Sequence, residues 1–187
     1  MVDGRDNCPT KQDVVDGIEC FLELYKQIIA EKSFKGYDVK LLTESIKFVD
    51  ADPSGWSVWE FTADETWCNI NGVLHGGAYA LIFDMCTALT MQTVSKAGYW
   101  DFLGGVSRTL NISYLKGIPL GTKVCIRCQV EQHGRTMALL SGYFESLDGK
   151  TKYATVEHHK VHVPSIPEYA ARLEAMKNVR RRERLKL

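Results

Sequence analysis

The sequence predicts an α+β domain in which an antiparallel sheet wraps around one long central helix, with a further helix at each end of the chain. Three observations indicate this fold. Residues 69–95 form a long apolar stretch with helical character. Two stretches with strand character precede it and four follow it, and Asp148-Gly149 is typical of a tight turn between two of the later strands.

The composition suits one globular domain with a substantial core. The chain has 187 residues, of which 45% are hydrophobic and 25% are charged. We place a helical extension at residues 1–35, the main domain at 36–163 and a basic helix at 164–187. The formal net charge is zero, so overall charge does not favour binding to nucleic acid or to a membrane surface.

No stretch of the sequence is apolar enough to predict a membrane-spanning helix. The best candidate contains His75, two glycines, Asp84 and several threonines. Residues 1–13 lack a hydrophobic signal region, and their acidic side chains argue against a mitochondrial presequence. We therefore expect a cytoplasmic protein, with mitochondria and peroxisomes left open as compartments.

Residues 10–33 have the pattern of an amphipathic helix. Thr10 is a candidate N-terminal cap, and Gly36 marks the expected exit from the helix. We expect this helix to pack on the main domain or on a neighbouring subunit, and a regulatory or partner-binding role is the alternative. Its apolar positions recur at helical spacing: Ile18, Phe21, Leu22, Tyr25, Ile28 and Ile29.

Two strands are predicted next, at residues 37–50 and 56–63. The sequence Asp-Pro-Ser-Gly at residues 52–55 supplies the turn between them. We expect the aromatic residues of the second strand to pack in the core or at a dimer interface rather than to hold a substrate. These residues are Trp56, Trp59 and Phe61.

Asp84 is the only formally charged residue between Glu65 and Lys96. It lies in a run of Ala, Leu, Ile, Phe and Met that predicts a helix buried on most of its faces. Burial disfavours an ionised carboxylate unless other groups donate hydrogen bonds to it or its pKa rises. A lone carboxylate in such a helix therefore indicates a function.

The predicted start of the same helix, His75-Gly76-Gly77, is a second candidate functional feature. Two glycines at a helix N-terminus leave backbone N–H groups that a ligand atom can approach closely. The positive end of the helix dipole adds to their effect. A carbonyl oxygen bound there would be polarised while an acyl group is attacked.

His75 and Asp84 cannot act on one bond within one chain. They are nine residues apart, which corresponds to roughly 13 Å along a helix with a rise of 1.5 Å per residue. If the Gly76 amide and Asp84 belong to one site, helices from two subunits must lie antiparallel to build it. A two-fold dimer then contains two such sites.

Asn69 lies six residues before His75. Its side-chain amide can both donate and accept hydrogen bonds, so it could hold a water molecule or a carboxylate near the helix start. The sequence Asn-Ile-Asn-Gly at residues 69–72 is also rich in turn formers, so a purely structural turn is the alternative.

Four strands are predicted after the helix, and Gly134-Arg135 and Asp148-Gly149 supply the turns between the last three. Strict alternation in the first of them places small polar side chains on one face and apolar ones on the other. The polar set is Ser107, Thr109, Asn111 and Ser113, and the apolar set is Leu110, Ile112 and Tyr114. The four strands are expected at residues 105–115, 123–133, 136–146 and 152–163.

Six cysteines raise the question of a disulfide or zinc site. Cys125 and Cys128 form a C-x-x-C motif, but alternation along their strand points the two thiols to opposite faces. No second C-x-x-C motif completes a zinc site. We therefore expect reduced intracellular thiols and no metal.

Residues after 164 predict a C-terminal helix. Its start, Ser165-Ile166-Pro167-Glu168, matches a capping box, and Tyr169, Leu173, Met176 and Val179 follow at helical spacing. The basic residues 177–187 suit a solvated face at a helix C-terminus, because they lack the interleaved aromatics of a nucleic-acid-binding segment. The final Leu185-Lys186-Leu187 only loosely resembles a peroxisomal S-K-L signal.

The combination of Asn69, His75-Gly76-Gly77 and Asp84 with the later segment GVSRTLNISYLKGIPLG, residues 105–121, resembles the hotdog-fold acyl-CoA thioesterases. The relevant branch contains phenylacetyl-CoA-type and 4-hydroxybenzoyl-CoA-type enzymes and the small animal acyl-CoA thioesterases. The resemblance covers about residues 36–163. It implies the hotdog fold, in which an antiparallel sheet wraps a central helix.

This resemblance implies an acyl-CoA thioester hydrolase that works as a homodimer or a dimer of dimers. The thioester carbonyl would bind at the Gly76 amide with help from His75, and Asp84 of the facing subunit would act as general base or as nucleophile. Asn69 and Ser107 would position the water or the carboxylate. No metal or bound cofactor is required, because CoA arrives with the substrate.

His158, Lys160 and His162 share one face of the last predicted strand. Metal binding there is disfavoured, because no carboxylate or cysteine joins them at a suitable spacing. A basic face that binds the phosphates of CoA is the preferred interpretation, with Arg135 from the hairpin turn and Gly77 from the helix start as further contacts to the substrate.

Two alternative functions remain open at this stage. A hotdog hydratase or dehydratase would use a histidine and a carboxylate, which His75 and Asp84 formally provide, but the typical motifs of those enzymes are not matched. A sensor or scaffold would bind acyl-CoA without turnover, yet it would not need a buried base. Product analysis separates the first alternative, and turnover separates the second.

Overall fold

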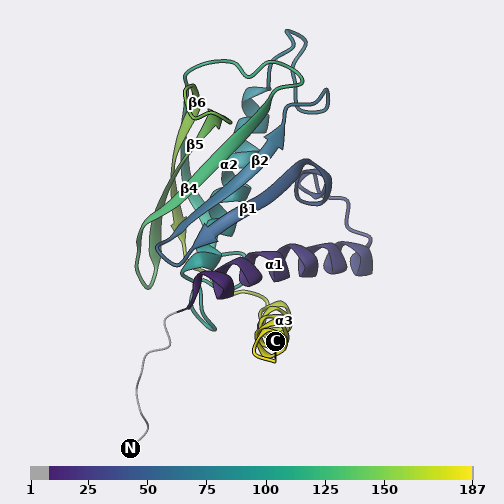
Figure 1. Ribbon diagram of the computed structural model, residues 1–187, viewed down its shortest axis with the longest axis vertical. Coiled ribbons are helices and arrows are strands. Elements are labelled where there is room, and N and C mark those ends of the chain that lie inside the picture. The colour runs from purple at the N-terminus through teal and green to yellow at the C-terminus, as the bar shows by residue number, and fades with distance from the viewer. Residues whose placement is uncertain (1–8, 187) are drawn as a thin grey trace, which may run out of the picture.

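The computed structural model describes residues 9–186 and shows a six-stranded antiparallel sheet around one helix (Figure 1). The strand order is β1-β2-β4-β5-β6-β3, so β1 and β3 are the edge strands. The central helix is α2, Gly76–Thr90, and the terminal helices are α1, Lys11–Lys32, and α3, Pro167–Arg184. This arrangement confirms the predicted hotdog fold. The strands are β1 Ile46–Asp52, β2 Trp56–Thr62, β3 Val106–Tyr114, β4 Lys123–His133, β5 Met137–Ser146 and β6 Lys152–Val161.

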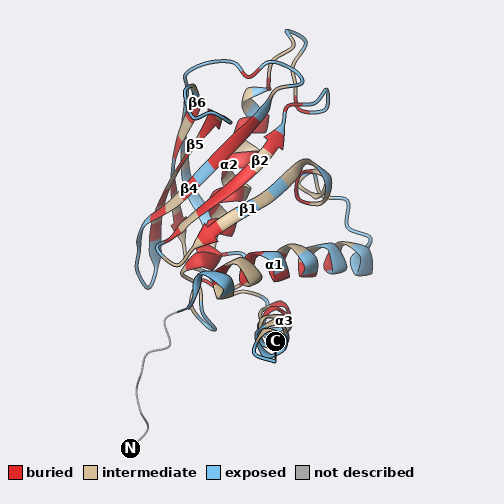
Figure 2. Ribbon diagram, viewed as in Figure 1, coloured by how far each residue is buried: buried red, intermediate tan, exposed pale blue. Residues whose placement is uncertain are grey.

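The core lies between α2 and the concave face of the sheet. Figure 2 shows the buried segments on β2 and β4 and along one side of α1. Trp59 and Phe61 of β2 are at most 1% exposed, which confirms that these aromatic residues pack in the core. Trp56 is partly exposed instead, with Lys11 of α1 lying 5.4 Å from its ring centre. The buried face of α2 consists of Ala78, Tyr79, Ile82, Phe83, Cys86, Thr87, Leu89 and Thr90.

The first helix, Lys11–Lys32, agrees with the predicted residues 10–33 to within one residue at each end. Thr10 caps it, and the side chain of Asp13 accepts a hydrogen bond from the Thr10 backbone in return, which completes a capping box. The helix ends at Lys32 because Ser33 adopts a left-handed conformation with φ 49°. The expected exit at Gly36 is therefore wrong by three residues.

The first predicted strand, residues 37–50, is wrong over its first half. Residues 41–45 form a single π-helical turn, and β1 begins only at Ile46. Leu41 and Leu42 are both buried although they are neighbours in sequence. Consecutive inward side chains do not fit the alternation of a strand but fit a helical turn.

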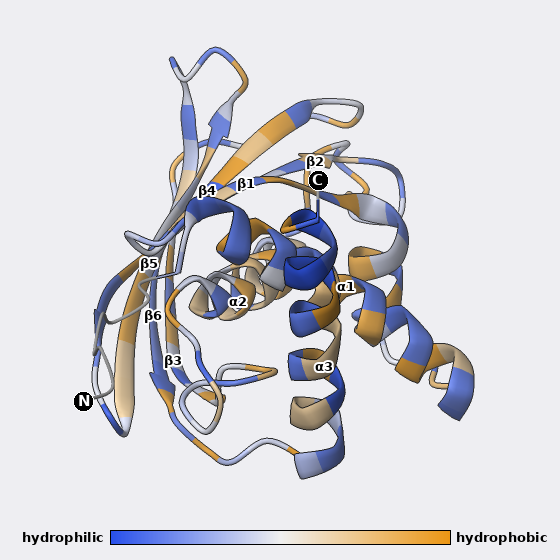
Figure 3. Ribbon diagram, turned by 60° about the horizontal axis from the view of Figure 1, so that its bottom comes forward, coloured by the Kyte–Doolittle hydropathy of each residue, from blue (hydrophilic) through white to orange (hydrophobic). Residues whose placement is uncertain are grey.

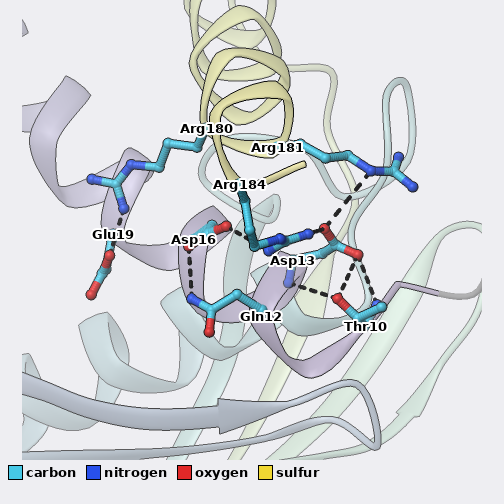
Figure 4. A network of polar contacts seen from close by, with 8 residues as sticks. All are labelled: Thr10, Gln12, Asp13, Asp16, Glu19, Arg180, Arg181 and Arg184. Atoms are coloured by element: carbon cyan, nitrogen blue, oxygen red, sulfur yellow. Dashed lines mark hydrogen bonds and ion pairs between the residues drawn. The ribbon is translucent and has the colours of Figure 1, made fainter. Parts of the chain in front are cut away.

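The C-terminal helix binds α1 through its basic residues, and its start lacks the predicted capping box. The Ser165 hydroxyl donates to the Asp101 carbonyl, 2.8 Å away, and Pro167 opens the helix without a side-chain cap. Arg184 lies between Asp13 and Asp16 of α1, at 2.5 Å and 2.9 Å (Figure 4). The other pairs that join α3 to α1 are Arg172–Glu31, Arg180–Glu19, Arg180–Glu23 and Arg181–Asp13.

The predicted solvated face of α3 is thus largely a surface that contacts α1. Figure 3 shows the hydrophilic C-terminal part of α3 beside α1. Below these ion pairs, Tyr169 of α3 packs on Phe102, whose ring in turn contacts Phe21 of α1. These contacts confirm that α1 packs on the main domain.

Within residues 9–186, no helix is long and apolar enough to cross a membrane. The five cysteines of this described part are free thiols, and Cys8 lies outside it. Cys128 belongs to the core on the concave face, whereas Cys125 lies beside Arg127 and Glu145 on the opposite face. The predicted opposite orientation of the two thiols is confirmed. Leu187, the last residue of the signal-like tripeptide, also lies outside the described residues.

Candidate active site

The start of α2 leaves one backbone amide open. His75 occupies the N-cap position, and its ring Nδ1 accepts a hydrogen bond of 2.9 Å from the Gly77 N–H. The N–H groups of Ala78 and Tyr79 both donate to the His75 carbonyl. Among the described residues, no acceptor binds the Gly76 N–H. Both glycine amides were expected to be open. The Gly76 N–H is open, whereas the Gly77 N–H donates to the capping side chain of His75.

A shallow cavity of about 380 Å³ lies beside the open Gly76 amide. The Tyr114 hydroxyl donates to the Gly76 carbonyl at 3.1 Å, and the ring of Tyr114 meets that of Tyr79 edge-on at 5.5 Å. A ligand that reaches the Gly76 N–H would thus lie beside the aromatic rings of Tyr79 and Tyr114. The lining residues are Leu74, Gly76, Tyr79, Tyr114, Leu115, Lys116 and Gly117.

Asp84 lies in the middle of α2 and turns toward the edge strand β3. Its side chain is 33% exposed, so the carboxylate expected to be buried is only partly buried in a single chain. The Ser107 hydroxyl of β3 donates to Asp84 Oδ1 at 2.5 Å. The structure therefore brings together these two predicted site residues, one from the helix and one from the strand that follows it.

A β-bulge determines which way Ser107 points. The pairing of β3 with β6 shifts register between Ser107 and Thr109. Ser107 pairs with Lys160 and Leu110 pairs with His158, so both face α2. The predicted common face of Ser107 with Thr109, Asn111 and Ser113 is wrong, because the extra residue of a bulge reverses the alternation.

His158 and Lys160 of β6 lie under α2 beside Asp84. They are 0% and 2% exposed, so they do not form the predicted exposed basic face. The physical reason is that they share the inward face of β6 with Ala154 and Val156, which belong to the core. His158 Nε2 lies 3.5 Å from Asp84 Oδ1.

Arg135 and His162, which were also predicted to bind CoA, lie away from this cluster. The ring of His162 packs against that of Trp100 at 5.2 Å. Arg135 is exposed in the turn between β4 and β5. Within residues 9–186, no group of three or more His, Cys, Asp or Glu side chains is arranged to hold a metal ion.

Burial sets the charge state of the two basic residues beside Asp84. It lowers the pKa of His158 to about 4, with a further lowering by the charge of Lys160 and an opposing effect of Asp84. Burial likewise lowers the pKa of Lys160 to about 8, against the effect of Asp84. At neutral pH, His158 is therefore a neutral imidazole, while Lys160 still carries its positive charge.

Asn69 forms a turn in this chain. Its side-chain Oδ1 accepts from the Asn71 N–H at 2.9 Å, and its own N–H donates to the Val73 carbonyl. Gly72 completes the turn with φ 72°, a conformation that suits glycine. Asn69 is not among the residues that contact Asp84 in the described chain.

Thr87 is a member of the cluster that sequence reasoning missed. Its hydroxyl oxygen lies 2.6 Å from His158 Nδ1 and 2.6 Å from the Phe83 carbonyl. The available signal was its position three residues after Asp84, on the same side of the helix. Its partner on β6 could not be inferred from that spacing.

The chain resembles thioesterases in sequence. The family profile described as "Thioesterase superfamily" matches residues 71–152. The human protein named "Acyl-coenzyme A thioesterase 13" is 30% identical over 96 residues, which cover 51% of this chain and 64% of the human one. The chain thus spans slightly less than two thirds of that relative.

Solved structures show the same similarity over a greater length. Zebrafish thioesterase superfamily member 2 is 30% identical, with a TM-score of 0.62, and the match covers 75% of this chain and 96% of that protein. The Escherichia coli PaaI protein of the phenylacetic acid degradation operon is 16% identical, with a TM-score of 0.57, over 77% and 98% of the two chains. At that identity, the second match concerns the fold alone.

Proposed function

Because the chain belongs to the thioesterase superfamily, as the resemblance in its sequence indicated, we propose that it hydrolyses acyl-CoA thioesters to the free acid and CoA. The human relative carries this activity in its name. The observation that carries the proposal is that α2 provides both an open backbone amide and a carboxylate fixed by a hydrogen bond. The Gly76 N–H is free at the positive end of α2, and Ser107 fixes the partly exposed Asp84.

The two groups belong to different subunits in this proposal. Gly76 and Asp84 are eight residues apart on α2, roughly 12 Å along the helix, which is too far for one thioester group. Strand β3 is an edge of the sheet, and most of its residues are exposed. A second copy paired along this edge covers it and places a second α2 antiparallel to the first. The protein works as a homodimer or as a dimer of dimers.

The thioester carbonyl oxygen accepts a hydrogen bond from the Gly76 N–H, and the helix dipole stabilises the negative charge that develops on it. His75 supports this site by capping the first turn. Asp84 of the facing subunit removes a proton from water while the water oxygen attacks the carbonyl carbon. The C–S bond then breaks, and the CoA thiolate takes up a proton.

A nucleophilic role of Asp84 is the second route to the same products. Its carboxylate would attack the carbonyl carbon and form a mixed anhydride, which water would open. Ser107 would orient the carboxylate in either route. Asn69 would position the water, which it would have to reach from the loop before α2. Arg135 and His162 stay candidates for contacts with the CoA phosphates. Neither route requires a metal or a bound cofactor.

Release of free thiol from a panel of short, long and aromatic acyl-CoAs tests the proposal. We expect wild-type turnover with at least one class, and a loss of about 10³-fold or more in kcat for Asp84→Asn and Asp84→Ala. Glu157→Gln is the matched control, because that carboxylate is exposed on the outer face of β6. Binding of acyl-CoA without thiol release from any class would contradict the proposal and favour a sensor, and a hydrated acyl-CoA product would favour a hydratase.

A further inference from the structure

His158 is enclosed within the protein, and one of its ring nitrogens lacks a partner. The side chain is 0% exposed. Its Nδ1 lies 2.6 Å from the Thr87 hydroxyl oxygen. Its Nε2 is fully buried and has no hydrogen-bond partner in the described part of the chain. A buried polar atom without a partner is costly and calls for a functional explanation.

The hydrogen bonds of Thr87 determine which nitrogen of His158 carries the proton. The Thr87 hydroxyl lies 2.6 Å from the Phe83 carbonyl oxygen, which can only accept. The single hydroxyl proton is therefore directed to that carbonyl, and the hydroxyl oxygen offers a lone pair to His158. Nδ1 must then donate, so a neutral His158 has its proton on Nδ1 and a lone pair on Nε2.

The lone pair of His158 Nε2 faces the carboxylate of Asp84. The distance from Nε2 to Asp84 Oδ1 is 3.5 Å. Two acceptors at that separation repel each other unless a proton lies between them. A proton placed between the two side chains would remove this repulsion and give His158 Nε2 the partner that it lacks.

The groups around this pair determine how readily the imidazole of His158 accepts a proton. Lys160, on the same strand, lowers the pKa of His158 in addition to burial, and His159 contributes in the same direction. Ser107 donates to the same oxygen of Asp84, from the other strand packed here. Asp84 is the group that favours protonation of His158.

We propose that His158 is a positioning residue for hydrolysis, which presents an acceptor nitrogen to Asp84 and takes over the proton that Asp84 removes from water. This inference rests on the proposed thioesterase function. The water oxygen forms the new bond to the acyl carbon, and its proton passes through Asp84 to His158 Nε2. When the C–S bond breaks, the same proton returns through Asp84 to the CoA thiolate, so the products are the acid and the CoA thiol.

Substitution of His158 by glutamine separates proton acceptance from packing. The glutamine amide N–H₂ can donate to Asp84 but cannot accept a proton from it. We expect His158→Gln to lower kcat about 10²-fold with little change in KM. A hydrogen bond donated to Asp84 stabilises its carboxylate. The acid limb of the pH profile, where kcat/KM falls at low pH, should therefore move to lower pH by roughly one unit. The control His133→Gln changes an exposed histidine at the end of β4, which contacts Tyr99, and should change neither quantity.

Thr87 gives a second test with a nearly isosteric change. In Thr87→Val the Nδ1–H loses its acceptor, so the ring proton should move to Nε2 and donate to Asp84. We expect the same fall in kcat and the same shift of the acid limb, and Thr87→Ser, which keeps the hydroxyl, should restore most of the rate. Circular dichroism and size-exclusion chromatography of each full-length variant establish that it is folded.

Nitrogen-15 NMR of histidine-labelled protein reads the tautomer without any substrate. We expect the wild-type His158 resonances, identified by their loss in His158→Gln, to show the proton on Nδ1. A proton on Nε2 in the wild type would overturn the inference, even if the enzyme hydrolyses thioesters. A folded His158→Gln variant with wild-type kcat, or with an unmoved acid limb, would also overturn it. Absence of thiol release by the wild type, with the expected tautomer present, would instead contradict the proposed function.

Discussion

Ser107 and Asp84 are 23 residues apart in the chain, yet the Ser107 hydroxyl lies 2.5 Å from Asp84 Oδ1. The chain leaves α2, passes through the loop before β3, and returns along the sheet edge to this contact. The bulge after Ser107 turns the hydroxyl inward at the one position where it meets the carboxylate. The contact holds Asp84 in one orientation at the open edge of the sheet.

Removal of the Ser107 hydroxyl should therefore affect turnover more than binding. We expect Ser107→Ala to lower kcat about 10- to 100-fold with little change in KM, because a hydrogen bond to a charged group contributes about 1.5–3 kcal/mol. Steady-state thiol release measures both constants. Ser113→Ala, on the outward face of the same strand, is the control. An equal loss in the two variants would indicate a general effect on β3 rather than a role at Asp84.

Lys160 should reduce the stability of the folded protein at neutral pH. Its ammonium group is 2% exposed, and burial lowers its pKa from 10.5 to about 8. We expect Lys160→Met to raise the free energy of unfolding at neutral pH by about 1–3 kcal/mol, because a buried charge is replaced by an apolar side chain of similar size.

The pH dependence of stability provides the check on Lys160. Its folded-state pKa lies below the ordinary value, so the unfolded chain binds more protons between about pH 8 and 10.5. Wild-type stability should gain a favourable contribution as pH rises through this window, and denaturant unfolding should show no such contribution for Lys160→Met. A variant less stable than the wild type at neutral pH would contradict the interpretation.

Local periodicity was sufficient to predict where α2 and strands β3 to β6 lie along the chain. It also identified Asp84 and Gly76, whose chemistry contrasts with their apolar surroundings. The bulge after Ser107 could not be predicted, since it is a property of the pairing between two strands. The contact of Thr87 with His158 likewise depends on how α2 packs on β6.

The ion pairs between α1 and α3 should make a measurable but small contribution to stability. Arg184 is 32% exposed and lies between Asp13 and Asp16. We expect Arg184→Glu to lower the free energy of unfolding by about 1 kcal/mol at low salt and by less at high salt. The double variant Arg184→Glu/Asp16→Arg, in which the two charges are exchanged, should recover part of the lost free energy of unfolding. Denaturant titrations at two salt concentrations measure both effects, and an additive loss in the double variant would contradict a direct pairing.

The contact between Asp13 and Arg184 should also persist in mild acid. Burial acts to raise the pKa of Asp13, but hydrogen bonds from Arg184 and Thr10 outweigh it and lower the pKa to about 2. This contribution to stability is present above the ordinary value of 3.8 and is lost as pH falls through 2. Asp13→Asn should therefore be less stable than the wild type above about pH 4, and the difference should disappear only at lower pH. Acid titrations followed by circular dichroism measure this difference.

Gly76→Ala is a clean test of the open amide. An added Cβ would lie 3.5 Å from the Tyr114 hydroxyl, an ordinary contact, and Gly76 does not have a positive φ. Alanine should therefore preserve the fold, and it is a better helix former than glycine. The methyl group should obstruct approach to the N–H and lower kcat/KM about 10²-fold. Wild-type kcat/KM in this variant would exclude the Gly76 amide as the carbonyl site.

The most direct test of a site shared between two subunits is activity after mixing two inactive variants. Asp84→Asn and Gly76→Ala subunits, carrying different affinity tags, are co-expressed, and thiol release is measured on the purified hetero-oligomer and on the unfractionated mixture. Each mixed dimer should contain one intact site, so a random mixture should regain about a quarter of wild-type activity. Activity no higher than that of the separate variants would contradict the account and place Gly76 and Asp84 in different functions.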